Sequence, residues 1–432
     1  MIDINLVREN PKLVKDNIKK KFKLDKIKYV DELLEVDEKW KKAKFQEEQL
    51  RAERNKVSKE INEAKKAKNE KKADQLLKRA KKIPEEIIEL ERERLILEDK
   101  MLNLQRSIPN IISKNVPLGK DDSENKEEKK FGKIKKFDFP VKSHVEILEN
   151  LGLVDFDSSA RVSGNGFYYI EGDLALLNAA LINYTRDIMV KKGFRYIETP
   201  LLLKEEVIDR VTDLNDKTQQ IYLTNDDPKM AMIGTSEHSL IGRYVNQEID
   251  EKKLPIKHTS YSMCFRKEIG SHGIDEKGLY RTHQFNKIEM VVICSPDIAE
   301  SEKYYKEMQN ITLEIFEGLE IPVRVLKICS GDLGDLKYEQ VDIEAWSPRK
   351  NAYFEVGSCS NLTDAQARKL GISTRIKGVR AIPHTLNNTA MATSRALVAF
   401  IENNQNADGT INIPKALQPY MNGKKKIIME KK

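Results

Sequence analysis

An arginine and a glutamate stand two residues apart in the stretch CFRKE, at Arg266 and Glu268. Alternate residues of a strand point to the same face, so these two side chains could act together. The guanidinium group of Arg266 suits a phosphate, which it can bind through two parallel hydrogen bonds. Glu268 could accept a hydrogen bond from an exocyclic amine. A surface ion pair is the alternative interpretation of this pair alone.

The chain returns from a loop, 269–281, in an apolar-alternating run, 283–290. Phe285 could stack on a purine ring, and Glu289, four residues on, lies on the same face of a strand. Three glycines and several cations in the loop predict a flexible segment. Phe285 alone could be a core residue, but the combination of these side chains on one hairpin favours a binding site.

Three other clusters carry polar side chains that could meet a ligand. In TSEHSL (235–240), two hydroxyl groups and an acid precede a helix, which is also an ordinary capping arrangement. In EVGSCSN (355–361), Glu355 and Ser358 could hold a hard divalent cation beside phosphates, with a polar turn as the alternative. Arg395 begins an apolar helix, where a cation needs an anion unless it snorkels to water.

Several other chemistries have no signature in this sequence. It contains no GxxxxGK[ST] P-loop, no GxSxG nucleophile elbow and no set of kinase motifs. The four cysteines form no CxxC pair and the six histidines no HxxxH pattern, so neither a zinc site nor a disulfide framework is predicted. No apolar run approaches the ~20 residues of a membrane span. The first residues lack the apolar core of a signal peptide, so a cytoplasmic location is expected.

The elements that must position these side chains begin with a long helical segment. A chain of 432 residues with 34% charged residues predicts two or three domains, one of them an extended solvated helix or helix pair. Unbroken apolar heptads run over 36–64 and 76–104, on either side of a polar stretch, 65–72. We predict an antiparallel hairpin of two helices, each about 35 residues and therefore about 50 Å long.

Two features of this predicted arm are distinctive. The companion heptad series are interrupted by charged residues at Glu47, Arg54 and Arg94, and Pro84 could kink the second helix. The segment 51–82 carries 13 Lys/Arg against 5 Asp/Glu. A basic surface of this kind can follow the phosphates of a nucleic acid, although a solvated coiled-coil surface is the other interpretation.

The rest of the chain predicts an α+β catalytic domain. Short β-like runs such as 287–293 and 340–346 are separated irregularly by helical stretches, which is typical of an antiparallel sheet flanked by helices. We predict an N-terminal arm domain over 1–110, a charged linker over 111–140 and the catalytic domain over 141–432.

Taken in order, these stretches resemble the seryl-tRNA synthetase family of class II aminoacyl-tRNA synthetases. The stretch 264–290 resembles the second class II motif, GFRYIETP (193–200) the first and NNTAMATSR (387–395) the third. More specific to the family are TSE (235–237), GLYRTHQFNKIEM (278–290), CSNLTDAQARKL (359–370) and IPKALQPYM (413–421). The likeness covers nearly the whole chain, including the helical arm.

The resemblance implies a role for each matching residue. Thr235, Ser236 and Glu237 are expected to bind the amino end of L-serine, while Glu289 and Thr389, with Asn387 close by, read its hydroxyl group. The residues expected to bind ATP are Arg266, Lys267, Glu268, Arg281, Thr282, Phe285, Glu355, Val356, Gly357, Ser358 and Arg395. Arg266, Glu268 and Arg395 would be catalytic, Glu355 and Ser358 would coordinate Mg²⁺, and no zinc is expected.

The resemblance also implies partners. The arm is expected to lie along the elbow and long variable arm of tRNA(Ser), supplied by one subunit of a homodimer to a tRNA charged on the other; tRNA(Sec) is left open as a second acceptor. The chain departs from many bacterial members at Asn388, Ala390 and Ser394, where they have glycines, and at Gly357, where Ser or Val is common. The loop EIGSHGID (268–275) and the stretch TSEH (235–238) are more similar to archaeal or eukaryotic members.

Two other functions are compatible with parts of this pattern. A synthetase-like paralogue that loads an amino acid onto a carrier protein would be expected to lack the long arm, which this chain has. A nucleic-acid-binding protein with an inactive catalytic fold would be expected to lack Arg266, Glu268 or Arg395, and all three are present.

Overall fold

The computed structural model describes residues 1–212, 220–268 and 278–429. The chain divides into two compact units, Met1–Pro109 and Asn110–Lys432.

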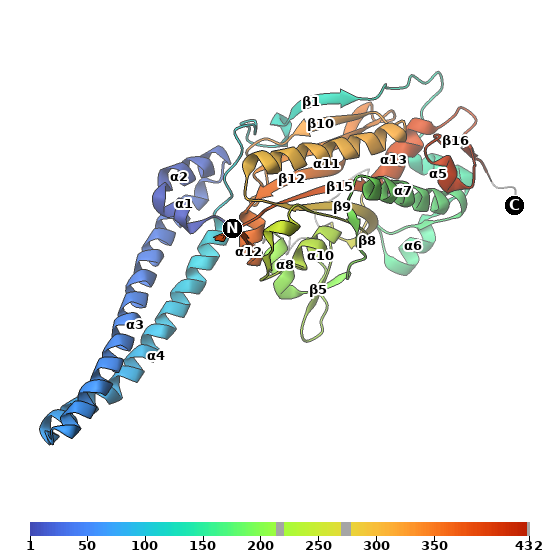
Figure 1. Cartoon of the computed structure of the whole chain (residues 1–432). Coiled ribbons are helices and arrows are strands. Elements are labelled where there is room, and N and C mark those ends of the chain that lie inside the picture. The colour runs from blue at the N-terminus through green and yellow to red at the C-terminus, as the bar shows by residue number, and fades with distance from the viewer. Residues whose placement is uncertain (213–219, 269–277, 430–432) are drawn as a thin grey trace. The chain divides into compact units, whose positions relative to one another are not determined.

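The first unit is built on the predicted helical hairpin (Figure 1). The long helices α3 (Lys28–Lys66) and α4 (Glu70–Ser107) pack against each other, preceded by α1 (Ile4–Glu9) and α2 (Pro11–Lys20). Heptad positions form the seam between α3 and α4, so the predicted arm is confirmed; the buried apolar residues of the two helices are Val30, Leu33, Val36, Ala43, Val57, Ala64, Ala73, Ile83, Ile87, Met101 and Leu104. Pro84 lies inside α4, which continues past it as one helix.

Two of the three interruptions in the heptads, Glu47 and Arg94, meet each other across this seam. Arg94 Nε donates to Glu47 Oε2 at 2.9 Å, and Arg51 Nη2 donates to Glu47 Oε1 at 2.9 Å. Only 7% of Glu47 is exposed, so an ion pair replaces one apolar layer of the hairpin. A buried pair of this kind favours one register of the two helices, because any slip would break the bond between Arg94 and Glu47.

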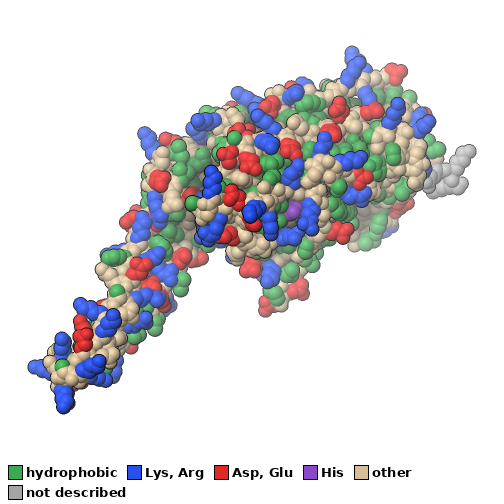
Figure 2. Space-filling model, in the orientation of Figure 1, with side chains coloured by type: hydrophobic (Ala, Val, Ile, Leu, Met, Phe, Trp, Pro, Cys, Tyr) green, Lys and Arg blue, Asp and Glu red, His purple; other side chains and the backbone are tan. Residues whose placement is uncertain are grey.

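Basic side chains gather at the end of the hairpin, as Figure 2 shows. Around the turn between α3 and α4, the exposed lysines are Lys65, Lys66, Lys68, Lys71 and Lys72. None of them belongs to the seam, so this surface is free to face a polyanion.

The second unit is an α+β body around one eight-stranded sheet of order β1-β10-β11-β12-β15-β9-β8-β4. Its strands are β1 (Lys126–Phe131), β4 (Arg195–Tyr196), β8 (Ile256–Phe265), β9 (Gln284–Cys294), β10 (Val323–Lys327), β11 (Glu339–Ser347), β12 (Ala352–Thr363) and β15 (His384–Ala392). All neighbours are antiparallel except β4 and β8. This confirms the α+β prediction.

Helices cover both faces of the sheet (Figure 1). The described helices of this unit are α5 (His144–Leu151), α6 (Phe156–Ser163), α7 (Gly172–Lys191), α8 (Glu205–Val211), α10 (Ser236–Gly242), α11 (Ile298–Gly318), α12 (Ala365–Leu370) and α13 (Thr393–Asn404). Even-numbered residues of β9, such as Ile288 and Met290, enter the main core with α7, α11 and α13. Odd-numbered residues Val291 and Ile293 enter a second core with α8, α10 and α12. Earlier odd-numbered residues of β9 therefore face the side on which the pocket described below opens.

Small two- and three-stranded sheets complete the unit. They are β2 (Val154–Asp155) with β3 (Tyr169–Ile170), β5 (Leu202–Lys204) with β6 (Met230–Met232), β16 (Ile411–Asn412) with β17 (Lys426–Ile427), and β7 (Glu248–Ile249) with β13 (Ser373–Ile376) and β14 (Val379–Ala381).

The segment 111–140 differs from the linker that its charge predicted. Residues Lys126–Phe131 form β1, which pairs antiparallel with β10 along the edge of the large sheet. Its side chains are mostly exposed, which explains why a strand here has the composition of a linker: an edge strand needs no apolar face when only its backbone is paired.

Candidate active site

A pocket of about 410 Å³ opens beside the centre of the large sheet. Every residue predicted to bind serine or ATP lines it except Ser236 and Lys267. Ser236 is fully buried and its hydroxyl group donates to the Ser260 carbonyl, so its side chain points into the protein. The Lys267 ammonium group lies 5.9 Å from the centre of the Tyr222 ring. Residues 269–277, most of the predicted glycine-bearing loop, lie outside the described residues.

One corner of the pocket gathers amide and carboxylate groups from three elements. Glu237, at the start of α10, accepts hydrogen bonds on Oε1 from Gln366 Nε2 at 2.8 Å and Asn387 Nδ2 at 2.9 Å. Burial and the nearby Glu289 charge raise the pKa of Glu237. Thr235 caps α10 by accepting from the Glu237 N–H, so the capping interpretation of TSEH is correct and the same residues also line the pocket.

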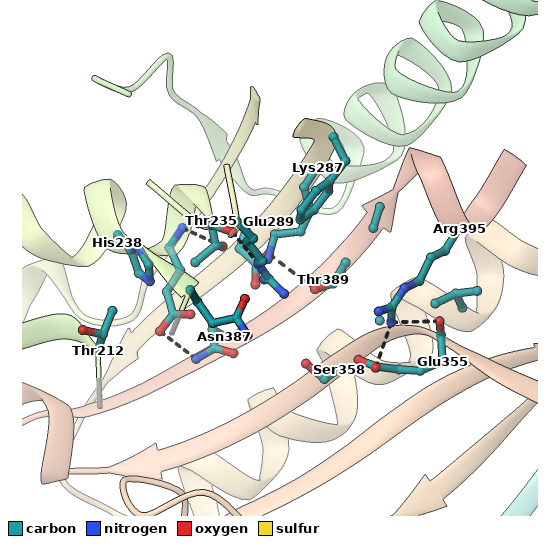
Figure 3. A pocket seen from close by; sticks show the side chains of 18 of the residues that line it. Thr212, Thr235, His238, Lys287, Glu289, Glu355, Ser358, Asn387, Thr389 and Arg395 are labelled. Atoms are coloured by element: carbon teal, nitrogen blue, oxygen red, sulfur yellow. Dashed lines mark hydrogen bonds and ion pairs between the residues drawn. The ribbon is translucent and has the colours of Figure 1, made fainter. Parts of the chain in front are cut away.

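Beside this corner, Lys287 and Glu289 form a buried ion pair (Figure 3). They stand two apart on β9 and are 6% and 2% exposed. Thr389 lies directly opposite Glu289 on β15, and its hydroxyl group donates to Glu289 Oε2 at 3.5 Å. Sequence reasoning did not single out Lys287. Its place between Phe285 and Glu289, in the same alternation, was the signal that could have found it.

Arg266 leaves the end of β8 and lies over the Phe285 ring, with 5.2 Å between the guanidinium carbon and the ring centre. Its Nε donates to the Gly234 carbonyl at 3.2 Å. These two contacts hold the Arg266 side chain in place. The outer nitrogens of its guanidinium group remain available to a ligand in the pocket that Arg266 lines.

Arg395 finds the anionic partner that its place in α13 predicted. Its Nη1 donates to Glu355 Oε2 at 2.8 Å, and the guanidinium group lies 5.3 Å from the centre of the Tyr280 ring (Figure 3). Although burial alone would raise it, the pKa of Glu355 is lowered by Arg395 and Arg266. Glu355 is therefore ionised near neutral pH.

Three polar atoms in the pocket wall are buried and lack a hydrogen-bond partner within the described parts of the chain: Gln220 Oε1, His238 Nδ1 and Thr282 Oγ1. Burial and the charges of Lys287 and Arg266 lower the pKa of His238 to about 3, so its ring is neutral. A bound molecule is one source of the missing partners.

The described residues contain no group of three or more His, Cys, Asp or Glu that could hold a metal ion. All four cysteines are buried and free. A metal ion in this pocket would therefore have to take most of its ligands from a substrate or from water. No helix within the described ranges is long and apolar enough to cross a membrane.

Fold and pocket together define the catalytic core of a class II aminoacyl-tRNA synthetase. The family description "tRNA synthetase class II core domain (G, H, P, S and T)" matches residues 217–404, and "Seryl-tRNA synthetase N-terminal domain" matches residues 1–112. A serine--tRNA ligase from Methanospirillum hungatei is 42% identical over 427 residues, 98% of this chain and 99% of the relative. One from Pyrococcus furiosus is 40% identical over all of this chain and 99% of its own length. The chain belongs to the seryl-tRNA synthetase family.

Two solved structures match this chain over its whole length. Seryl-tRNA synthetase from Pyrococcus horikoshii, complexed with ATP, superposes with a TM-score of 0.93 at 39% identity, covering all of both chains. Cytoplasmic serine-tRNA ligase from Naegleria fowleri, in complex with AMP, superposes with a TM-score of 0.88 at 32% identity, covering all of this chain and 99% of the other.

Proposed function

We propose that this chain joins L-serine to the 3′ end of tRNA(Ser) with ATP, as a homodimer in the cytoplasm. The carboxylate of serine attacks the α-phosphorus of ATP, the bond to the bridging oxygen breaks, and pyrophosphate leaves. The terminal hydroxyl group of the tRNA then attacks the carbonyl carbon of seryl-adenylate. AMP leaves and the ester remains on the tRNA.

Arg266 and Arg395 supply the charge that the first step needs. The serine carboxylate is already a nucleophile, so no side chain has to act as its base. Catalysis then consists of holding the reactants in line and neutralising charge on the phosphates. In this proposal Arg266 binds the α-phosphate and Arg395 the γ-phosphate, while Phe285 stacks on adenine and Glu268 meets the adenine end. The ATP and AMP complexes of the two structural neighbours support a nucleotide in this pocket.

Glu355 and Ser358 would hold Mg²⁺ beside the phosphates. The residues fit this ion: Glu355 is ionised, Ser358 lines the same wall, and Mg²⁺ in nucleotide sites needs only one or two carboxylates besides phosphate and water. When bound, the ion neutralises charge on the triphosphate.

Serine is selected by the corner around Glu289. A hydroxymethyl side chain can pair with Glu289 and Thr389, whereas the methyl group of alanine would leave these buried groups without a partner. Threonine would be excluded by crowding of its extra methyl group, and glycine would lose the same contacts as alanine. Glu237 would accept from the amino group of the substrate.

One observation carries the proposal: a single pocket unites a buried Lys287–Glu289–Thr389 corner with two guanidinium groups. Serine-dependent exchange of pyrophosphate into ATP, measured against threonine, alanine and glycine, tests it. We expect serine to be preferred by at least about 100-fold. Equal exchange with alanine, or none with serine, would contradict the proposal.

The second step, transfer of serine to tRNA, is tested by comparing different acceptors. Charging of tRNA(Ser), tRNA(Sec) and an acyl carrier protein with labelled serine separates a tRNA ligase from a carrier-loading paralogue. We expect tRNA(Ser) to be charged and the carrier protein to stay unlabelled.

A further inference from the structure

A short turn, 278–283, brings the chain back into β9 and carries three residues that line the pocket: Tyr280, Arg281 and Thr282. Tyr280 contacts two side chains. The guanidinium carbon of Arg395 lies 5.3 Å from the centre of the Tyr280 ring, and the Phe354 ring packs edge to face against it with 5.4 Å between the ring centres. The position of this turn therefore sets one wall of the pocket at the end that Arg395 occupies.

Outside the pocket, a buried histidine holds the start of this turn. The Leu279 N–H donates to His144 Nε2 at 3.3 Å. Since Nε2 accepts from Leu279, a ring proton lies on Nδ1, which faces Glu402 Oε1 at 3.5 Å. His144 and Glu402 are 6% and 1% exposed, so water does not replace either contact.

Gly278 packs against the same ring. A Cβ atom at this position would lie 2.4 Å from His144 Nε2, and the backbone φ of +112° is one that only glycine adopts readily. The turn therefore leaves no room for a side chain between Gly278 and His144, which is a second observation of the same contact.

His144 is itself fixed by its neighbours. It is the first residue of α5, whose start is set by a capping box between Ser143 and Glu146. The backbone of Lys142 exchanges two hydrogen bonds with the Gln405 side chain, at 3.0 and 3.1 Å. Glu402 stands seven residues after Arg395 on α13, two turns along one helix face. Helix α13 therefore carries both a pocket arginine and the carboxylate that faces His144.

We propose that His144 is a positioning residue for the ATP end of the pocket: with Glu402 it holds the Leu279 amide, and through it Tyr280 beside Arg395. It touches no substrate. The inference rests on the proposed function for its kinetic test, but not for the structural one.

The kinetic test is His144→Ala in serine-dependent pyrophosphate exchange. We expect KM for ATP to rise about tenfold, the effect of one lost buried hydrogen bond, while KM for serine stays within about twofold. His144→Gln, whose side-chain carbonyl can accept from Leu279, is expected to recover most of the loss. His258→Ala is the matched control, because His258 is equally buried at 6% but bonds Tyr244, in the turn that follows α10.

The structural test is hydrogen–deuterium exchange of the 278–284 segment, which needs no activity. We expect the Leu279 amide to exchange at least about tenfold faster in His144→Ala than in the wild type or His258→Ala. If the wild type shows no serine-dependent pyrophosphate exchange, the proposed function fails. The hydrogen–deuterium measurement still decides whether His144 holds the Leu279 amide.

A second variant covers poor folding of His144→Ala. Gly278→Ala pushes the turn off an intact His144, so it is expected to raise KM for ATP in the same way. Gly193→Ala is its control, since Gly193 also has a positive φ, of +80°, but open space around it. An equal rise in both KM values, unchanged Leu279 exchange, or the same effect in the controls would overturn the proposal.

Discussion

Glu355 and Ser358 stand three residues apart on β12, yet both side chains point to the same face of the sheet. In a regular strand a spacing of three would place them on opposite faces. The register shows why it does not: Glu355 lies opposite Glu344 and Ser358 opposite Asp342, which are two apart on β11, so Val356 is the extra residue of a β-bulge. The bulge thereby brings a carboxylate and a hydroxyl group to one pocket wall.

The bulge also brings Asp342 close to Glu355, and this predicts a pH effect on stability. Burial, followed by the Glu355 charge, raises the pKa of Asp342 to about 7 from an ordinary 3.8. The folded state therefore binds this proton more tightly than the unfolded chain does. The resulting contribution to the free energy of unfolding is complete below about pH 4 and is lost as pH rises through about 7. Asp342→Asn should show no such loss and should gain on the order of 1–3 kcal/mol over the wild type between pH 4 and 8. Urea unfolding at several pH values measures the free energy of unfolding of the wild type and of Asp342→Asn. Parallel curves of this free energy against pH for the two proteins would contradict the prediction.

Arg266→Ala should lower serine-dependent pyrophosphate exchange by at least about 100-fold, the scale of losing a main electrostatic contact to the transition state. Arg375→Ala is the control, because Arg375 is an exposed arginine paired with Glu248 away from the pocket. Near-normal exchange in Arg266→Ala would refute its role.

The sequence was sufficient for much of the architecture, because that part depends on local periodicity. Heptads alone predicted the hairpin, and the breaks at Glu47 and Arg94 turned out to be partners in one ion pair. The strand β1 was missed because an edge strand made of exposed charges has no apolar alternation to find.

The site was predictable where residues stand in one alternation and not where the backbone is irregular. The alternation of β9 predicted that Phe285 and Glu289 share a face, and it contained Lys287 as well. No local pattern reveals that a bulge aligns Glu355 with Ser358, or that Ser236 points inward to β8. The link from His144 to Leu279 joins residues 135 apart, which only the folded chain brings together.

Lys287→Met tests whether Lys287 and Glu289 stabilise the folded protein as a pair. It leaves the Glu289 carboxylate buried without its counter-ion, which should cost about 3–5 kcal/mol of unfolding free energy. Adding Glu289→Gln should recover part of that loss, which a double-mutant cycle in urea measures. The control Lys257→Met, which breaks a more exposed pair with Glu307, should cost less than about 1 kcal/mol. Strictly additive losses at Lys287 and Glu289 would show that the pair is not coupled.

Replacing the arm residues 31–107 by a short flexible linker should leave adenylate formation largely intact and abolish charging of tRNA(Ser). The reason is that the pocket is built entirely from the second unit. Alanine at the exposed lysines around the α3–α4 turn should raise KM for tRNA and reduce its dependence on salt, since fewer phosphates are contacted.

A mixture of arm-deleted chains with Arg266→Ala chains extends the test. If one subunit of a homodimer supplies the arm to the other, mixed dimers should regain charging that neither parent shows. Unchanged charging by the arm-deleted form alone would overturn the role of the arm.

Gly357→Ala should reveal how closely the pocket fits a hydroxymethyl group. A Cβ at this position would lie 3.1 Å from Thr389 Cβ and 3.2 Å from the Thr389 carbonyl oxygen. That carbonyl accepts from Thr312 Oγ1 at 3.3 Å, so the strand cannot move away freely. The Thr389 hydroxyl group should therefore shift by a few tenths of an ångström from Glu289, and KM for serine should rise about fivefold with little change in KM for ATP. Gly334→Ala, where the new methyl group would only make ordinary contacts with Lys337, is the control. An unchanged KM for serine in Gly357→Ala would mean that the Thr389 side chain does not set the fit of the substrate.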